Sequence, residues 1–221
     1  MHKISTFKSR NGDTLGIKNI EIDKTYFGKA LEDMNGADLT DARESLIDAL
    51  EYIVLYTADA GMSDKACEEL FVNARVLGVE NISFKGAPAS GWAIAKKLAR
   101  ACNITLLFET YTGYDFEEYA SLRDENTGII YNPLEYVKGG KGAYFAALYK
   151  NKFKNDVKIL RINDGLISDG KACLPEHGNG EVRECVSTLL SRCYAGYFSV
   201  CAVDGDLSGA LCETKRIFKE V

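Results

Sequence analysis

The feature that most constrains the fold is a regular alternation of helical patterns with short apolar runs, which begins near Thr40. Residues 40–53 carry apolar side chains at helical spacing, and an apolar run follows at residues 53–56. The same order recurs along the chain as far as residues 210–218. This alternation predicts an α/β fold in which a layered, mostly parallel sheet is flanked by helices.

The first 39 residues do not follow this alternation. Two strand-like segments, 3–7 and 15–22, lie on either side of Asn11 and Gly12, a dipeptide that tolerates positive φ and is typical of tight turns. The pattern predicts an N-terminal β-hairpin that covers an edge of the sheet. The expected organisation is a single domain over 1–221, with the hairpin and a connecting segment in 1–39 and the alternating core in 40–221.

The seven cysteines are an odd number and form no Cys-x-x-Cys pair, so the sequence does not predict a disulfide framework. Cys185 and Cys193 fall on the apolar stripe of the clearest amphipathic helix, which also carries Val182, Val186, Leu189 and Leu190. Cys201 lies in an apolar strand. Cysteines in such positions act as small hydrophobic residues, and we expect these three in the core.

The net charge of −5 bears on location and partners. It gives no basic surface for nucleic acid or anionic lipid, so neither is favoured as a partner. The sequence shows no signal peptide and no apolar stretch of membrane-spanning length. We therefore expect a cytoplasmic protein with a small-molecule ligand, and the sequence leaves a homo-oligomer open.

Polar residues directly after the strands are the first candidates for a site, because the carboxyl ends of parallel strands meet at one edge of a sheet. We expect Lys85, Glu109 and Asp204 to lie together there although they are far apart in sequence. The alternative is that such residues only form turns and cap helices. The strand-end candidates are Thr57, Asp59, Lys85, Ser90, Glu109, Thr110, Asn132, Asn163, Asp164, Asp204 and Asp206.

A glycine-rich turn suggests a phosphate-binding loop. Gly139, Gly140, Lys141 and Gly142 precede a predicted helix over 143–153, and glycine would let backbone N–H groups approach an anion there. The segment matches neither the Walker A pattern nor the dinucleotide fingerprint. Its core, Gly140-Lys141-Gly142-Ala143, resembles the pyrophosphate-binding turn of N-acetyltransferases, which implies ligand binding at this turn. A solvated glycine turn is the alternative.

The segment Phe84-Lys85-Gly86-Ala87-Pro88 resembles the strand-to-helix turn of orotate phosphoribosyltransferases. This resemblance implies that Lys85 lies beside a ligand, and Ser90 follows at the start of the next predicted helix. The acidic pair that this family carries on its following strand is absent at the corresponding place. The nearest such pair, in Asp204-Gly205-Asp206, comes close to the end of the chain.

Asp204-Gly205-Asp206 also resembles the paired carboxylates of Toprim domains. The resemblance implies Mg²⁺ as a cofactor for phosphoryl chemistry, with Glu109 as a third carboxylate, and carboxylate oxygens suit this ion. A tight Asp-Gly turn before a helix is the alternative. A zinc site is not predicted, because Cys173 and His177 offer too few ligands. A Cys-His nucleophilic pair at these two residues stays open.

Together these patterns favour an enzyme that acts on a phosphorylated or nucleotide-like small molecule, as a transferase or a hydrolase. Glu109, Asp204 and Asp206 are its predicted catalytic residues. The predicted ligand-binding residues are Asp59, Lys85, Ser90, Gly139, Gly140, Lys141 and Gly142. The alternatives are a non-catalytic ligand-binding or assembly protein, and Mg²⁺-dependent phosphoryl chemistry on nucleic acid. The sequence does not name the reaction, and whether the chain is catalytic at all is left open.

Overall fold

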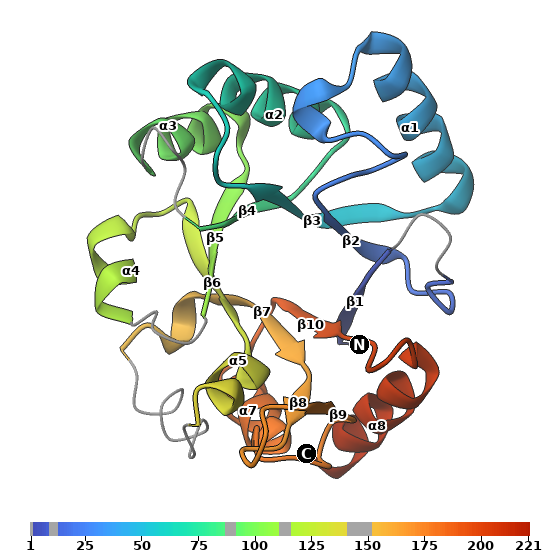
Figure 1. Ribbon diagram of the computed structural model, residues 1–221, viewed down its shortest axis with the longest axis vertical. Helices are drawn as coiled ribbons and strands as arrows, with labels where there is room; N and C mark the ends of the chain where they lie inside the picture. Colours follow the sequence, from blue (N-terminus) through green and yellow to red (C-terminus); the bar gives the residue numbers. More distant parts are fainter. Residues whose placement is uncertain (1, 9–12, 87–91, 111–115, 141–151) are drawn as a thin grey trace. The chain divides into compact units, whose positions relative to one another are not determined.

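A computed structural model describes residues 2–8, 13–86, 92–110, 116–140 and 152–221 of the protein (Figure 1). The strands are β1 (Lys3–Phe7), β2 (Asn19–Asp23), β3 (Tyr52–Asp59), β4 (Asn81–Lys85), β5 (Thr105–Glu109), β6 (Thr127–Tyr131), β7 (Val157–Ile162), β8 (Asp164–Gly165), β9 (Ala172–Cys173) and β10 (Tyr197–Val200). The α-helices are α1 (Gly36–Ala49), α2 (Asp64–Val76), α3 (Trp92–Cys102), α4 (Phe116–Leu122), α5 (Pro133–Lys138), α7 (Val182–Leu190) and α8 (Leu207–Glu220). Short 3₁₀ helices cover Leu31–Asp33 and Lys154–Asp156.

Eight of the described strands form a closed barrel in the order β1-β10-β7-β6-β5-β4-β3-β2. Their pairings are parallel, and β8 and β9 form a separate antiparallel pair. The predicted parallel α/β arrangement is confirmed, but the predicted layered sheet is wrong. A layered sheet and a barrel share the same alternation of strands and helices. They differ in whether the first strand pairs with the last, which a local pattern does not record.

The predicted N-terminal hairpin is also wrong. Strand β1 pairs with β2 in parallel, with Ser5 opposite Asn19 and Phe7 opposite Glu21. A tight two-residue turn joins antiparallel strands only, so the connection must cross back along the strand direction. The Asn11-Gly12 dipeptide itself lies outside the described residues.

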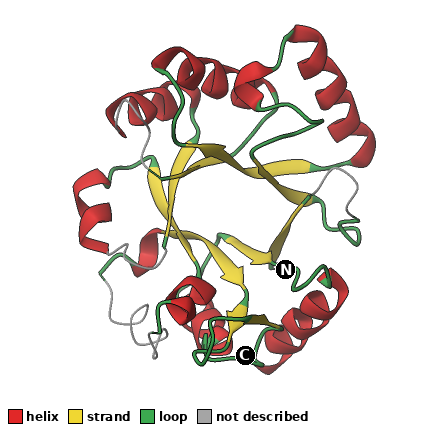
Figure 2. Cartoon of the chain, viewed as in Figure 1, coloured by secondary structure: helices red, strands yellow, loops and turns green. Residues whose placement is uncertain are grey.

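Backbone contacts divide the chain into two compact units. The amino-terminal unit comprises Ser5–Phe108 and Leu122–Gly128, and the carboxyl-terminal unit comprises Met1–Ile4, Glu109–Ser121 and Ile129–Val221. In the amino-terminal unit, α1, α2 and α3 lie along the outer side of strands β2 to β5 (Figure 2). None of the described helices is long and apolar enough to cross a membrane.

Side-chain caps fix the starts of two helices in the amino-terminal unit. The hydroxyl of Ser63 caps α2 by accepting a hydrogen bond from the N–H of Ala66 at 3.3 Å. Helix α1 begins about one turn before Thr40, where the sequence pattern starts. Its cap is Asn35, whose side chain accepts the N–H of Asp38 at 3.1 Å while Asp38 accepts the N–H of Asn35 at 3.0 Å. This reciprocal capping box fixes the earlier start.

The carboxyl-terminal unit is built around strands β6, β7 and β10, with α8 packed against β10 and α7. The predicted amphipathic pattern of α7 is confirmed, since Val182, Cys185, Val186 and Leu189 are all buried. Cys193 lies beyond the end of α7 and is exposed, so its expected place in the core is wrong. Its positive φ of 57° puts it in the turn that leaves the helix.

Leu189 offers a direct test of this core. It is 2% exposed, so Leu189→Asp would bury a carboxylate without a partner and cost several kcal/mol. We expect the variant to unfold at ordinary temperature in a circular dichroism melt. Ser187→Asp, on the exposed side of the same helix, should melt close to the wild type. A near-native melting temperature for Leu189→Asp would show that the inward face of α7 is wrongly placed.

Candidate functional site

An ion pair between Glu109 and Arg161 lies at the centre of the candidate site. Glu109 ends β5, and Arg161 lies within β7. The Nε of Arg161 donates to Oε1 of Glu109 at 3.1 Å, and Nη2 donates to Oε2 at 3.4 Å. The Arg161 side chain is 2% exposed, whereas that of Glu109 is 29% exposed. The carboxylate therefore reaches solvent from one side while its cationic partner is buried.

The buried guanidinium is also held from the other side. Its Nη1 donates to the hydroxyl of Ser199 in β10 at 2.8 Å. Strands β10, β7, β6 and β5 are consecutive neighbours in the barrel, so the three side chains span this run of strands. Because a guanidinium offers a rigid, planar set of donors, these contacts fix its orientation.

Two asparagines that follow β6 and β7 extend the network. The Nδ2 of Asn132 donates to Oε1 of Glu109 at 2.8 Å. The Nδ2 of Asn163 donates to Oδ1 of Asn132 at 2.9 Å, and Oδ1 of Asn163 accepts the N–H of Leu134 at 3.3 Å. The Asn132 backbone N–H donates to the hydroxyl of Thr110 at 3.0 Å. The strand ends of this unit thus present a connected set of amide, hydroxyl and carboxylate groups.

The loop after β7 is organised by the buried carboxylate of Asp164, which is 1% exposed. It accepts hydrogen bonds from four backbone N–H groups, those of Gly165, Glu176, Gly178 and Gly180, at 2.7 to 3.1 Å. A Cβ at Gly178 or Gly180 would lie within 2.8 Å of Asp164 Oδ1, so the loop requires glycine at both positions. Asp164 directly follows Asn163, and its anchoring therefore also supports the asparagine network.

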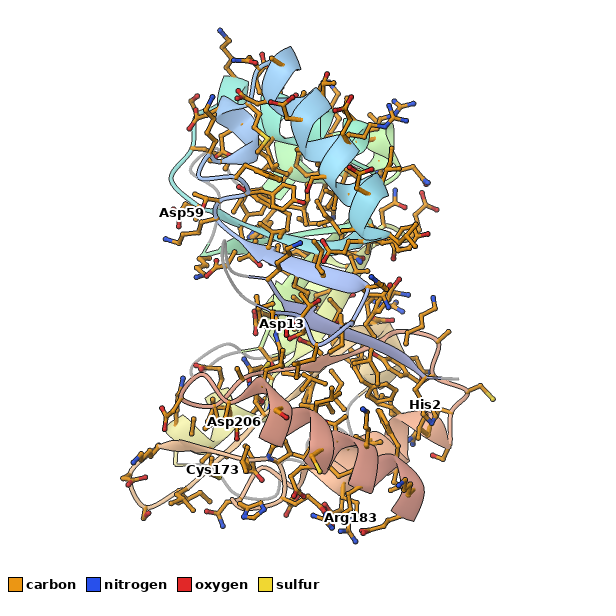
Figure 3. The ribbon with its side chains drawn as sticks, turned by 90° about the vertical axis from the view of Figure 1, so that its right-hand side faces the viewer. His2, Asp13, Asp59, Cys173, Arg183 and Asp206 are labelled. Atoms are coloured by element: carbon orange, nitrogen blue, oxygen red, sulfur yellow. The ribbon has the colours of Figure 1, made fainter. Side chains whose placement is uncertain are left out.

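Charged side chains tie the same loop to the helices behind it. Glu176 accepts two hydrogen bonds from Arg183 of α7, both at 2.6 Å, and one from Arg216 of α8 at 2.8 Å. The hydrogen bonds from Arg183 hold the pKa of the Glu176 carboxyl below its usual value. Figure 3 shows Arg183 close to α8. The loop is therefore held in two ways. Asp164 binds its backbone N–H groups, and the Glu176 side chain ties it to α7 and α8.

Of the three predicted catalytic residues, Glu109 lies in the network. Asp204 and Asp206 form the turn that leads into α8. Asp204 is exposed with a φ of 49°, and Asp206 caps α8 by accepting the N–H of Gly209 at 2.7 Å (Figure 3). This geometry matches the alternative of an Asp-Gly turn before a helix. A catalytic role for the two aspartates stays a prediction.

Lys85 and Asp59 end neighbouring strands of the amino-terminal unit, and each has an ion pair of its own. Lys85 pairs with Asp23 at 2.8 Å, and Asp59 pairs with Lys24 at 2.7 Å. All four side chains are substantially exposed. Both residues are thus at strand ends as predicted. A common site of Lys85 with Glu109 and Asp204 stays a prediction.

The glycine turn does not open a described helix. Gly139 and Gly140 end α5, and the N–H of Gly140 donates to the carbonyl of Val137 at 2.9 Å. The N–H of Gly139 bonds to the carbonyl of Glu135 at 3.3 Å. These donors therefore satisfy the helix end, and an anion would have to displace those bonds. Ser90, Lys141, Gly142 and the predicted helix over 143–153 lie wholly or mostly outside the described residues.

Burial disfavours Cys173 as the nucleophile of a Cys-His pair with His177. Burial raises the pKa of the Cys173 thiol to about 11, so the thiolate is a minor species at neutral pH. His177 is exposed on the loop that Asp164 anchors. We therefore assign neither residue a part in the site.

Sequence reasoning missed Arg161 and Ser199, which lie inside strands rather than after them. The available signal was an arginine within the apolar run Ile159-Leu160-Arg161-Ile162. A charged residue at the centre of a buried strand is rare unless it is paired. Such a residue points to a polar barrel interior.

A separate aromatic pocket lies in the amino-terminal unit, where β1 and β2 end. Its volume is about 430 Å³. Phe27 is 54% exposed and Phe7 is 38% exposed, which is unusual for phenylalanine. Phe27 has a φ of 53° and contacts the Tyr26 ring edge-on at 4.6 Å between centroids. The pocket is lined by Phe7, Lys8, Asp23, Thr25, Tyr26, Phe27 and Gly28.

The fold is shared with several solved structures. A xylose isomerase domain protein from Planctomyces limnophilus matches with a TM-score of 0.76 at 15% identity, over 100% of this chain and 98% of that chain. A D-tagatose 3-epimerase-like protein matches with a TM-score of 0.71 at 14% identity, over 99% and 98%. A xylose isomerase-like TIM-barrel protein from Mycobacterium smegmatis, in complex with magnesium, matches with a TM-score of 0.69 at 15% identity, over 93% and 84%. No family model and no curated protein matches the chain.

The chain therefore has the xylose isomerase-like TIM-barrel fold. This finding overturns the hypothesis of a transferase or hydrolase for a phosphorylated or nucleotide-like ligand, because the structural neighbours are described as sugar isomerases and epimerases. The same finding overturns nucleotide binding as a description of the chain. The hypothesis depended on the glycine turn, whose described N–H groups satisfy the end of α5.

The magnesium of the Mycobacterium smegmatis structure raises the question of whether the site here suits that ion. Mg²⁺ requires oxygen ligands at about 2.0–2.1 Å in octahedral geometry. Both oxygens of Glu109 instead accept N–H groups, and the guanidinium of Arg161 would repel a cation bound there. Two unit charges about 4 Å apart near a protein surface interact by about 4 kcal/mol, and a divalent ion doubles the repulsion. Among the described residues no group of three acidic, histidine or cysteine side chains could hold a metal. The site does not fit magnesium.

The ion pair predicts a strong dependence of stability on Arg161. Arg161→Met leaves the Glu109 carboxylate without its cation, and we expect the free energy of unfolding to fall by about 3 kcal/mol in urea titrations. Glu109→Gln should lower the free energy of unfolding by less in the Arg161→Met variant than in the wild type, because the two side chains interact directly. Arg43→Met, at an exposed position of α1, should change stability by less than about 0.5 kcal/mol. Additive effects of the two site substitutions would contradict the pairing.

Proposed function

We propose that this protein isomerises or epimerises a small sugar at the carboxyl ends of β5, β6, β7 and β10. The observation that carries the proposal is the Glu109–Arg161 pair, in which a partly exposed carboxylate lies against a buried guanidinium. Active sites of α/β barrels form at the carboxyl ends of the strands, where Glu109, Asn132 and Asn163 lie. The likeness to a D-tagatose 3-epimerase-like protein supports the choice of sugar chemistry.

The two side chains suit proton transfer beside a carbonyl group. In this reaction the Glu109 carboxylate removes a proton from the carbon next to the sugar carbonyl, and the electron pair moves to the carbonyl oxygen to give an enediolate. The nearby positive charge of Arg161 stabilises that oxyanion. Protonation of the same carbon on its opposite face by water, with release of the first proton from Glu109 to solvent, yields an epimer. Return of the first proton from Glu109 to the neighbouring carbon, with a hydroxyl proton transferred between the oxygens, yields the aldose or ketose isomer.

The remaining groups of the network are buried and support the Glu109–Arg161 pair. Asn132 and Asn163 are 8% and 6% exposed, and Thr110 and Ser199 are fully buried, so these side chains orient the pair rather than face a ligand. Their positions are held by hydrogen bonds within the carboxyl-terminal unit. A sugar at this site meets the Glu109 carboxylate, which is 29% exposed, and its carbonyl lies beside that group.

The aromatic pocket of the amino-terminal unit is a second candidate surface for a sugar. Exposed aromatic rings pack well against the apolar C–H face of a sugar ring, while Lys8, Asp23 and Thr25 offer polar contacts to hydroxyls. The positive φ of Phe27 costs on the order of 1–3 kcal/mol relative to an ordinary conformation. Such strain at a solvent-exposed ring is typical of residues retained for ligand binding.

Solvent deuterium exchange tests the proposed reaction. In D₂O we expect the wild type to incorporate deuterium at the carbon next to the carbonyl of D-tagatose or D-xylose, measured by proton NMR. Glu109→Gln should slow this exchange by about 100-fold or more, since general base catalysis contributes that much. Glu68→Gln, at an exposed position of α2, should leave the rate unchanged. The absence of exchange in the wild type, or its persistence in Glu109→Gln, would refute the proposal.

Phe27→Gly tests the aromatic pocket. Glycine adopts a φ of 53° without strain, so the melting temperature should be no lower than that of the wild type. The affinity for D-tagatose, measured by titration NMR, should fall about tenfold as the ring contact is lost. Leu15→Gly is a matched control, because Leu15 is also exposed, has a φ of 51° and precedes a glycine. Equal sugar affinity in Phe27→Gly and the wild type would exclude the pocket from sugar binding.

A further inference from the structure

The arrangement of donors around Glu109 assigns a specific role to positive charge in the site. Three N–H groups converge on this carboxylate, two from Arg161 and one from Asn132, at 2.8 to 3.4 Å. Arg161 is in turn fixed by Ser199 at 2.8 Å and is nearly excluded from solvent. The cation beside the carboxylate is therefore a permanent part of the protein chain.

The orientation of the asparagine amides follows from a backbone group. The N–H of Leu134 can only donate, so the Asn163 atom that faces it is the oxygen. The Nδ2 of Asn163 then points at Asn132, whose oxygen accepts it, and the Nδ2 of Asn132 consequently points at Glu109. Reversing either amide would place two donors or two acceptors opposite each other. The chain of hydrogen bonds therefore aims N–H groups at Glu109, and its polarity opposes a metal ion on that carboxylate.

We infer that Arg161 takes the place of a divalent cation beside Glu109 in this barrel, so that the proposed proton transfer needs no metal on that carboxylate. This inference deepens the proposed function and rests on it for the identity of the ligand. As the proton passes to Glu109, negative charge moves from the carboxylate to the sugar oxygen. The guanidinium lies beside the carboxylate from which the charge departs, and its positive charge also attracts the negative charge that develops on the nearby sugar oxygen. Asn132 and Asn163 act as positioning residues that keep donors directed at Glu109.

Manganese binding tests the inference without reference to activity. When Mn²⁺ is added to chelator-treated wild-type protein, its electron paramagnetic resonance spectrum should remain that of the free ion. Millimolar Mn²⁺ or Mg²⁺ should not raise the melting temperature of the protein. The double variant Asn132→Asp and Arg161→Gln replaces one donor by a carboxylate and removes the guanidinium. We expect this variant to bind Mn²⁺, after circular dichroism has established that it is folded. Stoichiometric Mn²⁺ binding by the wild type that Glu109→Gln abolishes would overturn the inference.

The activity readout separates this inference from the proposed function. If deuterium exchange on D-tagatose occurs, a chelator should change its rate by less than twofold, and Arg161→Lys should lower it by about tenfold or more because the planar donors are lost. Exchange that a chelator abolishes and Mg²⁺ restores would overturn the inference while leaving the proposed reaction intact. If no exchange occurs with any sugar, the proposed function fails, and the Mn²⁺ measurements still decide whether Arg161 excludes a metal.

Discussion

The ion pair between Glu109 and Arg161 is the interaction on which the candidate site depends. A guanidinium with 2% exposure is costly to bury unless its charge is balanced and its donors are bonded. Glu109 balances the charge, and Ser199 takes a further donor. The same contacts determine where the carboxylate points. The need to balance the buried charge of Arg161 therefore also fixes the position of the Glu109 carboxylate, which is the group proposed to take the proton.

The structure around this pair is rigid for an equally local reason. Asp164 draws four backbone N–H groups onto one buried carboxylate, which shapes the loop after β7. Its neighbour Asn163 is thereby held at the start of the hydrogen-bond chain that ends on Glu109. A site whose donors are oriented before the ligand arrives needs little reorganisation during the reaction. The loop is thus part of the chemistry although it makes none of the reacting contacts.

The sequence predicted the elements better than it predicted their closure. The apolar stripe of α7 was predicted at Val182, Cys185, Val186 and Leu189, which are buried, but not at Cys193, which is exposed beyond the helix end. Barrel closure was missed, because it depends on β1 pairing with β10 across almost the whole chain. The hairpin was wrong because the dipeptide Asn11-Gly12 suits a turn in either topology. Local patterns record propensity and burial, whereas closure is a long-range property.

The site was predicted in part for similar reasons. Glu109 was predicted as a site residue because it lies at the end of an apolar strand, where side chains of α/β folds commonly carry function, and its catalytic role stays a prediction. Asp206 follows the same positional rule but serves as the cap of α8. Position alone does not separate a cap from a reacting group, because both need a polar side chain at a strand-to-helix junction. Arg161 was missed because the positional rule considers only residues that follow strands, and Arg161 lies within one. Its role depends on Glu109 of β5 and Ser199 of β10, which only the fold brings close to it.

A crystal structure of the protein with D-tagatose bound tests the central claim most directly. The account predicts the sugar at the carboxyl ends of β5, β6, β7 and β10, with a carbon next to its carbonyl about 3–3.5 Å from an oxygen of Glu109. It also predicts that the Arg161 guanidinium remains beside Glu109, with no metal ion between the sugar and the carboxylate. A sugar held at this end of the barrel through a metal ion on Glu109, or one bound with no contact to Glu109, would contradict the account.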